Sequence, residues 1–90
     1  MPVEVRVPSV LQKVTQGEKL LRYDSGTVSE LLAAIDTDYP GFREQLIENG
    51  ELRRFVNIFL NDEDIRFLGK LDTPVADGDS IAILPALAGG

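Results

Sequence analysis

The sequence ends in Gly89 and Gly90, which follow the strand-like run of residues 80–85. Glycine has no Cβ, so a diglycine segment can lie extended in a narrow channel that side chains would block. The reactive group in such a channel would be the terminal carboxylate of Gly90. Frayed ends of domains are an alternative explanation. With eight glycines in 90 residues, however, chance places glycine at two specified positions on the order of once in a hundred sequences.

The composition limits the chemistry that the chain itself can perform. It contains no cysteine and no histidine. The first absence excludes disulfides, thiolate metal sites and a catalytic thiol, and the second removes the commonest general base and metal ligand. We therefore expect neither a catalytic residue nor a metal site, and the composition argues against a self-sufficient hydrolase or metalloenzyme.

Length and charge narrow the class of protein further. Ninety residues, 43% of them hydrophobic and 27% charged, predict one soluble globular domain. The net charge of −6 argues against a nucleic-acid partner and favours a protein with a basic docking surface. No apolar run approaches the roughly 18–20 residues of a membrane span, and the chain start lacks a signal-like pattern. These features predict a cytoplasmic protein without membrane contact.

The N-terminal half contains two predicted strands and a helix. Residues 3–7 alternate apolar and charged side chains, which predicts a half-buried strand, and residues 18–23 are expected to return antiparallel to it. Thr27 and Glu30 have the spacing of a capping box, so we expect the main helix to begin at Val28. Its apolar stripe is Val28, Leu31, Leu32 and Ile35.

The C-terminal half adds a crossover and the remaining strands. We expect the main helix to break at 39–41 and a second short helix, with Phe42, Leu46 and Ile47, to stop at Asn49-Gly50. A strand is then expected over 55–60, followed by a turn over 61–64 and a short strand over 65–68. A tight turn at 76–79 leads into the last strand, 80–84. This order predicts an α+β protein with the β-grasp (ubiquitin-like) fold, a mixed sheet of four to five strands around one main helix.

Pro85 marks the predicted end of the domain. Proline has no N–H, so strand pairing is expected to stop there. We therefore divide the chain into a β-grasp domain, 1–85, and a flexible diglycine tail, 86–90, made of Ala86, Leu87, Ala88, Gly89 and Gly90. Five extended residues reach about 17 Å, which is enough to enter the active site of another protein.

Two stretches and the tail carry a resemblance to a known family. Residues 54–67 (RFVNIFLNDEDIRF) and residues 76–85 (ADGDSIAILP), followed by ALAGG, resemble the ThiS/MoaD family of ubiquitin-like sulfur-carrier proteins. Within that family they look most like the CysO-type carriers of cysteine biosynthesis. The resemblance is close over residues 53–90, whereas residues 1–52 agree in layout more than in motif.

The resemblance implies a reaction cycle centred on Gly90. A terminal carboxyl with a pKa of about 3.5 is ionised at neutral pH and is a poor electrophile, so it must be activated. Members of the family are adenylated at this position by a ThiF/MoeB-like enzyme that uses ATP and magnesium. Sulfur then displaces AMP and leaves a C-terminal thiocarboxylate, so the chain would be a substrate of partner enzymes and not itself an enzyme.

The partners would bring the cofactors. In the CysO-like case a pyridoxal-phosphate (PLP)-dependent cysteine synthase holds the sulfur acceptor, and a JAMM-type metallopeptidase releases cysteine, so we expect no cofactor on this chain. Other acceptors remain open, namely thiamin, molybdopterin or a secondary metabolite. So do two other functions, a ubiquitin-like protein modifier and a passive β-grasp binding module.

Alternation in the last strands predicts a docking patch. If Ile81 and Ile83 face the helix, Ala82 and Leu84 face outward, and Phe59 lies outward on the neighbouring strand. The predicted partner-docking residues are therefore Phe59, Ala82 and Leu84, on the sheet face through which related carriers dock their activating enzymes. A face assignment that is wrong by one residue would instead bury Phe59.

Overall fold

Strands β1 (Val3–Arg6) and β2 (Leu20–Tyr23) pair antiparallel at one side of the sheet. The computed structural model describes residues 2–54 and 56–85 of the chain. Val3, Val5 and Val7 are buried, as the alternation predicted, because successive side chains of a strand point to opposite faces. A short 3-10 turn, η1 (Ser9–Leu11), begins the connection between the two strands.

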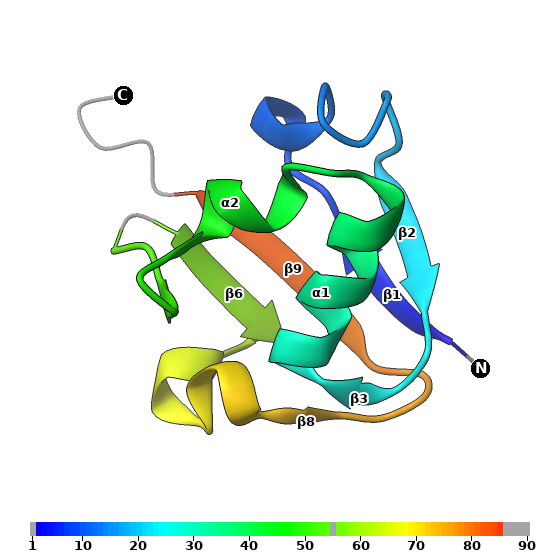
Figure 1. Ribbon diagram of the computed structural model, residues 1–90. Coiled ribbons are helices and arrows are strands. Elements are labelled where there is room, and N and C mark those ends of the chain that lie inside the picture. The colour runs from blue at the N-terminus through cyan, green and yellow to red at the C-terminus, as the bar shows by residue number, and fades with distance from the viewer. Residues whose placement is uncertain (1, 55, 86–90) are drawn as a thin grey trace.

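The last strand, β9 (Ser80–Pro85), lies in the centre of the sheet (Figure 1). It pairs parallel with β1 on one side and antiparallel with β6 (Val56–Leu60) on the other. A two-residue strand, β7 (Glu63–Asp64), forms the far edge, so the order is β2-β1-β9-β6-β7. The first and last strands of the domain are therefore neighbours.

Helix α1 (Val28–Asp38) crosses one face of this sheet (Figure 1). Both bonds of the predicted capping box are present: the Glu30 N–H donates to Thr27 Oγ1 at 3.1 Å, and the Thr27 N–H donates to Glu30 Oε1 at 2.9 Å. The apolar stripe of the helix is buried against the inner face of the sheet. The mixed sheet and the helix that crosses it form the β-grasp fold, as predicted from the order of strands and helices in the sequence.

The crossover after α1 contains a hairpin that the sequence analysis missed. Helix α2 (Phe42–Leu46) ends three residues before the predicted stop, and β4 (Ile47–Glu48) pairs antiparallel with β5 (Glu51–Leu52). Between them, Asn49 and Gly50 have φ angles of 56° and 79°. An Asn-Gly pair favours a two-residue hairpin turn with positive φ at both positions, so these residues make a turn and do not simply stop a helix.

The region after β6 also differs from the prediction. The turn occupies Asn61 and Asp62, both with positive φ, and the next two residues already pair as β7. The short strand predicted over 65–68 is wrong, because residues 65–67 form a 3-10 turn, η2 (Ile65–Phe67). The physical reason is a cap: the Asp64 side chain accepts a hydrogen bond from the Arg66 N–H at 2.8 Å, which favours a helical turn over an extended strand.

A separate two-stranded sheet lies next to the start of α1. After the 3-10 turn η3 (Lys70–Asp72), strand β8 (Pro74–Val75) pairs antiparallel with β3 (Gly26–Thr27). The first helical residue, Val28, donates its N–H to the Thr73 carbonyl at 3.0 Å. Within the described residues, no helix has the length and apolar character needed to cross a bilayer.

The start of β9 is held by a polar cluster around Asp79. Its carboxylate accepts the Ala76 N–H at 2.8 Å, closing the predicted tight turn, and the Asn61 side-chain amide at 2.9 Å. These two hydrogen bonds hold the pKa of Asp79 below its usual value, and the bond from the Ala76 N–H has the larger effect. Asn61 in turn accepts the Ser80 N–H at 2.9 Å. The cluster fixes the register of β9 against β6.

Candidate functional site

The predicted reactive residue, Gly90, and the tail residues Ala86, Leu87, Ala88 and Gly89 lie outside the described residues, as does Phe55. Their roles and the division into domain and tail stay predictions. What the structure does describe is the strand that precedes them in the sequence. Strand β9 ends at Pro85, in register with Val56 at the start of β6. The last described residue of the chain, Pro85, therefore lies at that end of the sheet.

The predicted face assignment agrees with the structure. Ile81 and Ile83 are buried in the core, whereas Leu84 is 51% exposed. Phe59 lies directly opposite Ala82, so the three predicted docking residues share the outer face of the sheet. Phe59 is half-buried, between the neighbouring strands β9 and β7, and contributes less exposed area than Leu84. The geometry of the patch is thus observed, and its docking role stays a prediction.

The outer face is hollowed beside Phe59. Both apolar and charged groups line the hollow, and they are Arg6, Phe59, Asn61, Asp62, Ser80 and Ala82. Arg6 reaches this position because β1 runs parallel to β9 and places it opposite Ala82. Four of the six lining residues are polar or charged, so the hollow offers hydrogen-bonding groups beside the apolar Phe59 side chain. Two of the three predicted docking residues line it.

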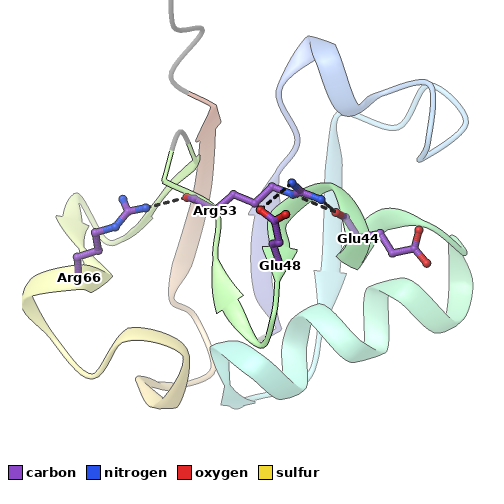
Figure 2. A network of polar contacts seen from close by, with 4 residues as sticks. All are labelled: Glu44, Glu48, Arg53 and Arg66. Carbon is purple, nitrogen blue, oxygen red and sulfur yellow. Dashed lines mark hydrogen bonds and ion pairs between the residues drawn. The ribbon is translucent and has the colours of Figure 1, made fainter.

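Two arginines brace the start of β6, opposite the end of β9 (Figure 2). Arg66, from η2, donates to Asn57 Oδ1 at 2.5 Å and to the Arg53 carbonyl at 2.9 Å. The Arg53 guanidinium donates to the Glu44 carbonyl at 3.2 and 3.0 Å and lies 3.3 Å from Glu48 Oε1. Arg53 and Arg66 therefore connect α2, the β4–β5 hairpin and η2 with the start of β6. Strand β6 in turn pairs with β9.

Sequence reasoning gave no signal for the Arg66 contacts. The acceptors lie nine and thirteen residues away from Arg66 in the sequence, and one of them is a backbone carbonyl. Such a bond depends on how η2 folds back along β6, and the region was predicted as a strand. Asn57, opposite Leu84, is the link between this brace and the docking patch.

We predict that Arg66→Met lowers the free energy of unfolding by about 1.5–3 kcal/mol, because charge-assisted hydrogen bonds are lost and a half-buried amide oxygen and carbonyl lose their donor. Urea unfolding measures this change. The matched control is Arg22→Met, since Arg22 is 60% exposed and lies 3.8 Å from Glu4, and we expect it to stay within about 0.5 kcal/mol of the wild type. Equal losses in both variants would show that the brace adds nothing.

Comparison with known proteins decides the family. The model of the ThiS family matches residues 5–90. The chain belongs to the ThiS family. The match includes the three predicted docking residues and both glycines of the C-terminal pair, so the whole candidate site lies within the part of the chain that the family model matches.

Three relatives cover the chain almost completely. It is 44% identical over 93 residues to the sulfur carrier protein CysO of Mycobacterium tuberculosis, with all of both chains covered. It is 31% identical to small archaeal modifier protein 3 of Haloferax volcanii, again over all of both chains. Among solved structures, the BexX/CysO complex of Amycolatopsis orientalis contains a chain with a TM-score of 0.93 and 41% identity, covering 98% of this chain and 99% of that one.

Proposed function

We propose that this chain is a sulfur carrier whose Gly90 carboxylate is adenylated and converted to a thiocarboxylate. The observation that carries this proposal is 44% identity, over the full length of both chains, to a protein named as a sulfur carrier. Gly89 and Gly90 have no side chains, so they allow the terminal carboxylate to enter the narrow active site that the reaction needs.

The proposed chemistry takes place in partner enzymes. In the active site of a ThiF/MoeB-like enzyme, the Gly90 carboxylate attacks the α-phosphorus of ATP and releases pyrophosphate, which gives an acyl adenylate. Hydrosulfide then attacks the carbonyl carbon, AMP leaves with the bonding electrons, and the resulting thioacid loses its proton to solvent. The product is a thiocarboxylate, which we propose delivers its sulfur to an acceptor on a pyridoxal-phosphate enzyme of cysteine biosynthesis, with a JAMM-type metallopeptidase as a later partner.

Intact-mass measurement tests the proposal. The chain is coexpressed with its adenylating enzyme and a sulfur source, and we expect a mass increase that corresponds to one sulfur replacing one oxygen. The control is the Mycobacterium tuberculosis relative, processed in the same way with its own enzyme. If that relative is converted and this chain keeps its original mass, the proposal is wrong.

A second function, protein modification, is favoured by the relative from Haloferax volcanii, which is named as a modifier. In that case the activated Gly90 carbonyl would be attacked by a lysine amine of a target, giving an isopeptide bond with loss of AMP. Immunoblots of cell lysates for larger covalent species distinguish the two functions. Species that disappear when Gly90 is removed would support modification.

We predict that Leu84→Glu raises the KM of the adenylating enzyme for this chain about tenfold and leaves kcat unchanged, because a charge then interrupts the proposed docking face. The side chain is 51% exposed, so we expect the melting temperature to stay near that of the wild type. Val10→Glu is the matched control, since Val10 is 41% exposed on η1. An unchanged KM for Leu84→Glu would remove this face from the docking surface.

A further inference from the structure

The most exposed large apolar side chain among the described residues is Phe67, at the end of η2. It is 87% exposed, compared with 51% for Leu84 and 41% for Leu68. Single exposed apolar residues are common on protein surfaces, so exposure alone does not indicate a function. Three further features distinguish Phe67: its turn is anchored by hydrogen bonds, the turn lies beside the proposed docking face, and charged residues surround it.

The turn around Phe67 is firmly anchored. Ile65 is fully buried, and the Leu68 N–H donates to its carbonyl at 3.0 Å. Arg66 is fixed through its backbone by Asp64 and through its guanidinium by Asn57. Neighbours bound in this way fix the backbone position of Phe67, whose side chain is 87% exposed. Because the turn is already ordered, the conformational cost of a contact here is limited to the rotamers of the Phe67 side chain.

The same bonds place the η2 turn, which ends at Phe67, beside the proposed docking face. Asn57, which accepts from Arg66, is in register with Leu84 across β6 and β9. A contiguous path therefore leads from Leu84 through Asn57 and Arg66 to the η2 turn. A partner that covers Leu84 and extends past the β6 side of the sheet would reach the turn that carries Phe67.

The charges around this turn specify the chemistry of the partner. The turn before β7 and β7 itself carry the exposed acids Asp62 and Glu63. The 3-10 turn η3 packs against η2 and carries the exposed acid Asp72 and the exposed base Lys70. Together with Asp64 and Arg66, which are less exposed, residues 62–72 hold four acidic and two basic side chains, so this segment has a net charge of −2. Phe67 is thus surrounded by a predominantly acidic surface, in a chain of net charge −6.

We propose that Phe67 is a second anchor for the adenylating enzyme, inserted into an apolar pocket whose rim carries lysine or arginine side chains. The apolar ring supplies the buried area, and the acidic flanks attract the basic rim and guide the encounter. This inference rests on the proposed function, because it assigns a second contact to the enzyme that activates Gly90.

The test is ATP–pyrophosphate exchange by the ThiF/MoeB-like enzyme encoded in the same genome, measured as a function of carrier concentration. We expect Phe67→Ala to raise the KM for the carrier about tenfold with kcat unchanged, because the anchor contributes to binding and not to the reacting atoms. Unfolding by urea should be unaffected at so exposed a position. Val10→Ala is the matched control for a remote exposed apolar side chain and should retain the wild-type KM.

Salt dependence tests the basic rim. We expect the wild-type KM to rise with ionic strength, and Glu63→Gln to weaken that dependence, whereas Glu18→Gln, on an exposed residue outside the turn, should not. If the wild-type chain supports exchange and Phe67→Ala has the same KM, the inference is wrong and the proposed function stands. If the wild-type chain supports no exchange while the mycobacterial relative does so with its own enzyme, both are wrong.

Discussion

Removal of Gly90 should abolish adenylation and thiocarboxylate formation while leaving the fold intact. The shortened chain still ends in a carboxylate, on Gly89, but that group falls about 3.3–3.6 Å short of its position in the full chain. Reaction with the α-phosphorus requires an approach of about 3–3.5 Å, so a deficit of this size prevents attack. Within the described ranges, 2–54 and 56–85, the core residues lie between Val3 and Ile83, so the melting temperature should not change.

The measurements are pyrophosphate exchange and intact mass, with a length-preserving control. Ala88→Gly alters the tail but retains its five residues and its terminal carboxylate, so we expect it to be converted. A truncated chain that is converted at the wild-type rate would contradict a role for Gly90. It would favour the remaining alternative, a β-grasp binding module whose C-terminus is incidental.

The second large effect is expected at Ile83, where substitution by aspartate should unfold the protein. Ile83 is 1% exposed and lies opposite the fully buried Ile58 in the two central strands. Burying an unpaired carboxylate and losing the isoleucine side chain together cost more than about 4 kcal/mol, which approaches the total stability of a small domain. Circular dichroism at 25 °C should show loss of native structure.

Leu84→Asp is the control for this prediction. The same charge is introduced one residue later on the same strand, but at an outward-facing position that is 51% exposed. We expect this variant to remain folded with a melting temperature near that of the wild type. A folded Ile83→Asp variant, or an unfolded Leu84→Asp variant, would contradict the contrast between the two faces of β9.

The parts of the fold that the sequence predicted well are those with local signals. Thr27 and Glu30 are three residues apart and bond reciprocally, so the start of α1 follows from the sequence alone. The alternation of Val3, Val5 and Val7 likewise placed one strand face in the core. The outward orientation of Leu84 followed from the same periodicity, so the outer face of the candidate site could be predicted without coordinates.

The parts that the sequence did not predict depend on competition between local signals or on distant partners. Residues 65–68 have a strand-like composition, but the Asp64 cap favours a 3-10 turn over an extended strand. Asn49-Gly50 is both a helix stop and a hairpin turn, and only the pairing of β4 with β5 distinguishes them. The bond from Arg66 to Asn57 depends on how η2 folds back along β6, for which no residue spacing gives a signal.

The central place of β9 has a consequence for how the protein is made. Strand β9 supplies the partner for both β1 and β6, yet it is the last element of the domain to be synthesised. Until residues 80–85 have left the ribosome, β1 and β6 expose unpaired edges and the inner face of the sheet remains incomplete. The domain is thus expected to fold in one late step, governed by contacts between the two ends of the chain, so its folding should be slow for its size.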